Sequence, residues 1–138
     1  MVLRPEAIKE RLLRLEEVIS HLEQLGTPGE QDLRADFRTA WLAERGLQLA
    51  AEIAFDVGNH ILSAHFGASA RDYEDILEQL GERGVIDADL RDRFRGLGGF
   101  RNILVHGYLA VDPIRVHAAV TQRLGDLERF AACMAQLM

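Results

Sequence analysis

The chain has 138 residues, of which 48% are hydrophobic and only three are proline, which predicts a single helical domain over residues 1–138 and excludes a disordered chain. A lone cysteine, Cys133, excludes an internal disulfide and a cysteine-based zinc site, and the net charge of −6 argues against general affinity for nucleic acid. No apolar run approaches the roughly 20 residues of a membrane span, and no charged leader precedes an apolar segment. We therefore expect a cytoplasmic protein without membrane contact.

Helical spacing of apolar residues dominates the first half of the chain. It predicts a first helix from about Pro5 to Leu25, with proline tolerated in the first turn, and a turn over residues 26–29. A long second helix is expected from about Gln31 to His65. It carries two apolar stripes, and because one stripe suffices to pack onto a small domain, the second indicates a partner subunit. The second stripe consists of Phe37, Trp41, Ala51, Phe55 and Leu62.

Capping residues divide the second half of the chain into further helices. Ser69 and Asp72 form a capping-box-like start to a third helix over residues 70–80. Asp87 can cap a fourth helix, and Asp112, followed by proline, starts the last one. No segment shows the period-two alternation of a strand for long enough to count. The sequence therefore predicts an all-α, antiparallel bundle of about five helices.

The run over residues 100–108, FRNILVHGY, carries the most chemically informative pattern. Arg101 offers a cationic fork for a phosphate, and His106 can move protons near neutral pH, which together are what metal-free phosphodiester cleavage requires. Gly107 predicts a helix end at His106. On an unbroken helix Arg101 and His106 lie about 140° apart, whereas Asn102 and His106 nearly align. Two copies of the motif facing each other across a dimer axis would surround one phosphate better than a single copy.

Arginines are concentrated around this motif. Residues 91–108 contain four arginines and one acid, a local charge of +3 on an acidic chain. Such a spot fits a small phosphate site better than a long binding groove. For Arg91, Arg93 and Arg95 alone, a solvated helix face is the favoured interpretation.

Arg-x4-His-x-Tyr, with a polar residue directly after the arginine, resembles the active motif of the HepT family of HEPN-domain toxins. The similarity covers nearly the whole chain, although glycine replaces the family's usual acidic or polar residue between histidine and tyrosine. The matching segments are Glu44-Arg45-x-Leu47-Gln48, Asp56-x-Gly58-Asn59-His60-Ile61, Tyr73-x-Asp75-Ile76-x-Glu78-x-Leu80-Gly81, Gly84-x-Ile86, Gly99-Phe100-Arg101-Asn102 and Asp112-x-x-Arg115-Val116.

The resemblance implies a homodimeric, metal-independent endoribonuclease toxin that needs no cofactor and belongs to a type VII-like toxin–antitoxin system. By matching positions, Arg101 and His106 would be catalytic and Asn102 supporting. Tyr108 would be the tyrosine to which a cognate MNT-type nucleotidyltransferase antitoxin attaches AMP. Cleavage would proceed by transesterification, with the RNA 2′-hydroxyl as the attacking group, so DNA, which lacks this hydroxyl, should not be cleaved.

Two questions stay open at this level. The alternative function is a non-catalytic helical subunit that binds a nucleotide or a minimal nucleotidyltransferase partner. It differs from the nuclease in whether two His106 side chains converge with Arg101 on one cleft. The long helix also carries a polar row that either lines the active cleft or is a solvated face. This row consists of Glu44, Gln48, Glu52 and Asp56.

Overall fold

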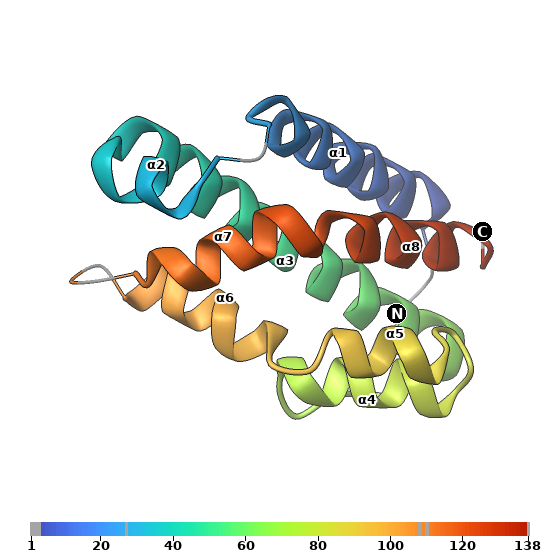
Figure 1. Cartoon of the computed structure of the whole chain (residues 1–138). Coiled ribbons are helices and arrows are strands. Elements are labelled where there is room, and N and C mark those ends of the chain that lie inside the picture. The colour runs from blue at the N-terminus through green and yellow to red at the C-terminus, as the bar shows by residue number, and fades with distance from the viewer. Residues whose placement is uncertain (1–3, 27, 108, 110, 138) are drawn as a thin grey trace.

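The computed structural model describes residues 4–26, 28–107, 109 and 111–137, and within these ranges every regular element is a helix (Figure 1). This confirms the predicted all-α fold class. The helices are α1 (Pro5–Gln24), α2 (Glu30–Ala35), α3 (Phe37–Phe66), α4 (Tyr73–Glu82), α5 (Ala88–Arg93), α6 (Leu97–His106), α7 (Pro113–Gln122) and α8 (Leu124–Ala135).

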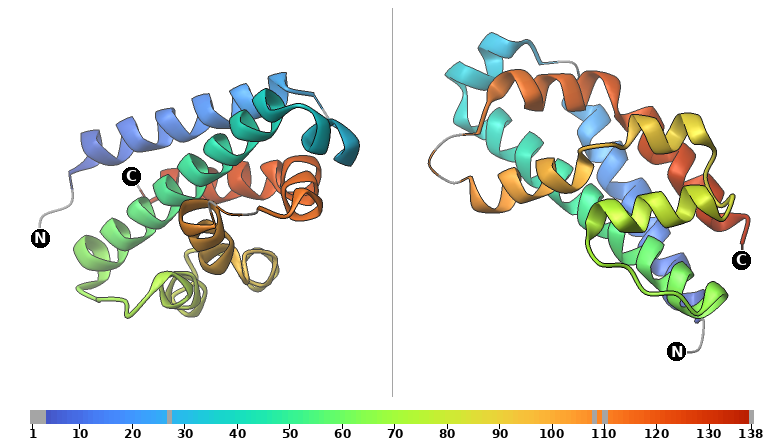
Figure 2. Two further views of the ribbon diagram at one scale, coloured as in Figure 1. Left: turned by 90° about the vertical axis from the view of Figure 1, so that its left-hand side faces the viewer. Right: turned by 90° about the horizontal axis from the view of Figure 1, so that it is seen from below.

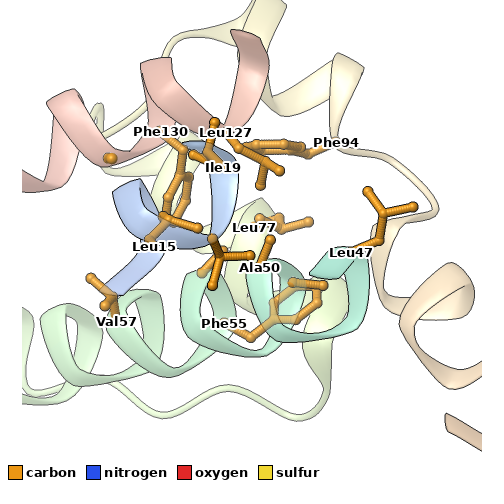
Figure 3. Packing of buried hydrophobic residues seen from close by; sticks show 14 of the residues in the cluster. Leu15, Ile19, Leu47, Ala50, Phe55, Val57, Leu77, Phe94, Leu127 and Phe130 are labelled. Carbon is orange, nitrogen blue, oxygen red and sulfur yellow. The ribbon is translucent and has the colours of Figure 1, made fainter. Parts of the chain in front are cut away.

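The 30-residue helix α3 is the centre of the bundle. Helix α1 runs antiparallel along one side of it, and α4 and α6 pack on the opposite side (Figure 2). Figure 3 shows how Leu15 of α1, Val57 of α3 and Phe130 of α8 meet in the interior, where all three are fully buried. Burying each such side chain contributes about 1.5–3 kcal/mol. This core fixes α3, which in turn supports α6.

Asp36 interrupts the helix that the sequence predicts over residues 31–65, so that helix is in fact α2 followed by α3. The backbone of Asp36 is extended, with φ −116° and ψ 104°. Its carboxylate accepts hydrogen bonds from the Arg38 amide at 3.0 Å and the Thr39 hydroxyl at 3.0 Å. The Thr39 hydroxyl, followed by the Arg38 amide, lowers the pKa of Asp36. The capping side chain therefore starts a new helix at Phe37.

The helix predicted over residues 70–80 is α4, and it begins later than the sequence predicts, at Tyr73. Asp72, rather than Ser69, is the N-cap, because its carboxylate accepts a hydrogen bond from the Asp75 amide at 2.8 Å. Gly81 lies inside α4, and the left-handed residue that follows the helix is Gly84, with φ +74°. The last predicted helix is likewise divided, into α7 and α8.

Two glycines orient α6. Asp87 caps α5 as predicted, but that helix ends at Arg93, and the chain turns at Gly96, whose φ is +85°. A Cβ at Gly98 would lie 2.8 Å from the Cβ of Tyr73, so the close approach of α6 to α4 requires glycine at this position. The glycines before the motif thus supply both a bend and a close crossing.

The second apolar stripe of the long helix divides between the core and the surface. Ala51, Phe55 and Leu62 are buried within the chain, which corrects the interpretation of the whole stripe as a partner surface. Phe37 and Trp41 are 55% and 66% exposed. Only the start of α3 therefore offers large apolar side chains from this stripe. No helix in the described ranges has both the length and the apolar character needed to cross a bilayer.

Candidate active site on α6

Arg101 is held in place by three neighbouring side chains. Its Nη2 donates a hydrogen bond to Oε1 of Glu52 at 3.0 Å, and its Nη1 donates to Oδ1 of Asn102 at 3.2 Å. The guanidinium carbon lies 5.1 Å from the centre of the Tyr73 ring, within range of a cation–π contact. The Arg101 side chain is only 19% exposed. Helices α3, α4 and α6 thus fix one cationic fork where they meet.

The polar row of α3 divides into two parts. Gln48 donates a hydrogen bond to Glu52 at 3.3 Å, so this pair belongs to the surroundings of Arg101. Asp56 instead accepts a hydrogen bond from Arg11 of α1 and lies 3.4 Å from Nε2 of His60. Burial raises the pKa of Glu44. Glu52 and Asp56 line the groove beside Arg101, whereas Glu44 and Gln48 are not among its lining residues.

An open groove of about 690 Å³ runs past Arg101 between α3, the start of α4 and α6. Its floor includes Tyr73, which stacks on Phe55 with ring centres 4.6 Å apart. Acidic side chains outnumber arginines three to two among the lining residues. The charged residues of the groove are Glu52, Asp56, Asp72, Arg71 and Arg101.

His106 occupies the last position of α6, as the sequence predicts, and its side chain is exposed. The Gly107 amide closes the helix by donating a hydrogen bond to the Ile103 carbonyl at 2.7 Å. With φ −83° Gly107 is not left-handed, so the helix end does not depend on glycine's special freedom here. His106 does not line the groove that contains Arg101 and Asn102. One chain therefore places Arg101 and Asn102 in the groove and His106 outside its lining. For Arg101 and His106 this agrees with the angular separation expected on a helix, whereas the expected alignment of Asn102 with His106 does not bring the histidine into the groove.

Tyr108 lies outside the described residues, so its role as the AMP acceptor stays a prediction. The neighbouring Leu109 is 91% exposed.

Glu52 and Tyr73 are the site residues that the sequence analysis did not single out. Both occur in patterns it noted, Glu52 in the polar row and Tyr73 in a segment shared with the family. Neither pattern indicates a contact with Arg101, because that contact requires the relative placement of three helices. The described residues contain no group of three histidine, cysteine or acidic side chains arranged to hold a metal ion.

Comparison with known proteins identifies the family. A family model described as "Ribonuclease HepT-like" matches residues 15–134. The chain belongs to the HepT-like ribonuclease family. This membership confirms both the family resemblance found in the sequence and the expectation of an enzyme of the ribonuclease class.

Two curated relatives are named nucleases. The chain is 31% identical over 120 residues to the tRNA nuclease HepT of Aphanizomenon flos-aquae, a match covering 86% of this chain and 81% of the relative. It is 26% identical over 125 residues to the mRNA nuclease HepT of Shewanella oneidensis, covering 91% of this chain and 93% of the relative. The two HepT relatives thus carry different substrate names.

Solved structures show the same fold. One is a tri-AMPylated Shewanella oneidensis HEPN toxin in complex with an MNT antitoxin, with TM-score 0.83 and 24% identity over 94% of this chain and 96% of that one. Another is the Bacillus subtilis cytosolic protein of unknown function YutE, with TM-score 0.81 and 19% identity over 96% of this chain and 88% of that one. The helical arrangement is therefore that of HEPN toxins.

Proposed function

We propose that this protein is a metal-independent endoribonuclease toxin in which Arg101 and His106 cleave RNA. The observation that carries the proposal is the placement of a nearly buried guanidinium, fixed by Glu52 and Tyr73, on a helix that ends in an exposed histidine. Family membership and the two nuclease relatives support the same reaction class.

The proposed reaction is an internal transesterification. His106 of one protomer accepts the proton of the 2′-hydroxyl, whose oxygen attacks the adjacent phosphorus. The bond to the 5′-oxygen breaks, and the symmetry-related histidine donates a proton to that oxygen. The products are a 2′,3′-cyclic phosphate and a 5′-hydroxyl. Arg101 offsets the charge that develops on the phosphoryl oxygens, and Asn102 supports the Arg101 fork.

The proposed active form is a homodimer. In one chain the exposed His106 does not line the Arg101 groove, and in the proposed dimer the second copy brings its histidine to that arginine. The start of α3 provides apolar surface for such contact, since Phe37 and Trp41 pack edge to face with ring centres 5.1 Å apart and are both exposed. Leu42 beside them is 61% exposed.

Regulation is proposed to act through Tyr108. A cognate MNT-type nucleotidyltransferase would transfer AMP from ATP to the tyrosine oxygen and release pyrophosphate. AMP would add a bulky anion two residues from His106, repelling the RNA phosphate and filling the space it needs. The AMPylated HEPN toxin with its MNT antitoxin, which shares this fold, supports the assignment of a partner of this type.

The non-catalytic alternative is a nucleotide- or partner-binding subunit, and one observation favours its partner-binding form. Glu52 already neutralises Arg101, and the surrounding groove is rich in acids, which disfavours a bound phosphate. The two functions differ in a simple assay, because only the nuclease cuts RNA.

RNA cleavage tests the proposal directly. The purified protein should cut single-stranded RNA in the presence of EDTA and leave DNA of the same sequence intact, because DNA lacks the attacking hydroxyl. His106→Ala should abolish cleavage while retaining the helical circular dichroism spectrum. Full cleavage by folded His106→Ala, or equal cleavage of DNA, would contradict the mechanism.

A further inference from the structure

A second hollow lies on α6 and shares no lining residue with the Arg101 groove. It is bounded by the start of α6, the middle of α3 and the helices α7 and α8. Its floor is apolar and includes Leu47, Leu97 and Phe100. Its volume of about 250 Å³ is below the roughly 300–1,000 Å³ typical of pockets for drug-sized ligands. The hollow therefore suits a single planar group better than a large ligand.

The rim of this hollow is basic. Four arginines and no acid occur among its lining residues, in contrast to the acid-rich Arg101 groove and to the chain's net charge of −6. Arg93 and Arg123 both donate to the buried carboxylate of Asp126, at 2.6 and 3.4 Å. The other two rim arginines are Arg95 and Arg115.

Arg95 and Arg115 are the rim cations best able to engage a ligand. Arg95 pairs with Asp92 at 3.1 Å, but both side chains are largely exposed, so the pair is weak and readily exchanged. Arg115 makes no ion pair within the described part of the chain, and its guanidinium lies 5.5 Å from the centre of the Phe100 ring. A guanidinium supported on an aromatic ring offers a flat face on which a base can stack. The rim thus combines a stacking surface with charge for a phosphate.

We propose that this hollow is a subsite for one nucleotide of single-stranded RNA. The base lies on the apolar floor beside Arg115, and the adjoining phosphates contact Arg95 and Arg115. Helix α6 is about 15 Å long, so a strand bound near Phe100 can follow the helix toward His106 at its other end. The subsite rests on the proposed function, since it takes RNA as the substrate. Its role is to bind the RNA strand at a nucleotide away from the cleaved bond.

Binding of an uncleavable RNA tests the subsite without relying on catalysis. Fluorescence anisotropy of the full-length protein with a labelled ten-nucleotide 2′-O-methyl RNA gives Kd over a range of salt concentrations. The double variant Arg95→Gln/Arg115→Gln should weaken binding at least tenfold and reduce the salt slope by about 0.7 for each lost phosphate contact. Arg14→Gln, which removes an exposed arginine of α1, should stay within twofold of the wild type. Equal affinity of the double variant and the wild type would overturn the proposal.

Filling the hollow with a larger side chain tests whether it binds the RNA base, separately from the charge of the rim arginines. Ala118→Phe places a ring in the hollow without changing any charge, and it should weaken binding at least fivefold while the thermal unfolding transition stays cooperative. Unchanged affinity of a folded Ala118→Phe variant would overturn the base subsite. Displacement of the RNA by AMP at a concentration near the Kd of the RNA would also overturn RNA as the occupant. If binding behaves as expected but ordinary RNA is never cut, the proposed function fails and the subsite stands.

Discussion

The guanidinium of Arg101 has its charge balanced inside the chain by Glu52, so this carboxylate controls where the arginine points. Glu52→Ala should reduce kcat for RNA tenfold or more with little change in KM, because the fork loses its orientation. Glu52→Gln retains an acceptor oxygen for Nη2 and should keep most of the activity. Steady-state kinetics with RNA as the substrate measure kcat and KM of the two variants.

A matched ion pair elsewhere provides the control for Glu52. Glu78 lies 3.5 Å from Arg91 and joins α4 to α5 away from the motif. Glu78→Ala should lower the thermal stability by no more than Glu52→Ala does, and it should leave kcat unchanged. A wild-type kcat for Glu52→Ala would show that Arg101 needs no such support.

Tyr108 is one of two tyrosines in the chain, which makes its proposed modification easy to localise. Tyr108→Phe should retain RNA cleavage but escape silencing by the cognate nucleotidyltransferase and ATP, because the acceptor oxygen is missing. Intact mass spectrometry should show AMP additions on the wild type and on Tyr73→Phe, and none on Tyr108→Phe. Additions that persist on Tyr108→Phe would place the acceptor elsewhere.

At the scale of the element, α6 depends on its crossing with α4. Gly98→Ala should destabilise the fold by about 1–3 kcal/mol, because the new Cβ meets the Cβ of Tyr73, which cannot rotate away. Gly99 has open space at the corresponding position, so Gly99→Ala should be neutral or stabilise by up to about 1 kcal/mol through helix propensity. Thermal unfolding compares the two variants. Equal effects of both substitutions would show that the crossing is not tight.

Helix positions followed from the sequence better than helix breaks did. Apolar spacing predicts α1 closely, and the carboxylates of Asp87 and Asp112 are N-caps as expected. Apolar periodicity continues across Asp36 and so does not predict the break there, whereas the capping bonds from Arg38 and Thr39 become evident only in the structure. A cap inside a periodic run can therefore divide a helix that pattern alone joins.

At the scale of the whole molecule, the sequence indicates which residues carry the chemistry but not which of them meet. The Arg101 and His106 motif is contiguous, yet its two side chains face different surroundings in the structure. Two of the partners of Arg101, Glu52 and Tyr73, come from positions 49 and 28 residues earlier in the chain, and only the packing of α3 and α4 against α6 brings them there. The amphipathic pattern of α3 overstated the free surface, because Phe55 pairs with Tyr73 inside the chain.

The central claim is that two chains together form each active site. Arg101→Ala and His106→Ala should each be inactive on RNA while running as dimers of about twice the 15.5 kDa chain mass in light scattering. Mixing the two inactive variants under conditions that exchange subunits should restore weak cleavage, above that of either variant alone and well below the wild type, because a mixed dimer brings one intact arginine and one intact histidine together but assists only one of the two proton transfers. Confirmed mixed dimers that remain inactive, or a fully active monomer, would contradict the account.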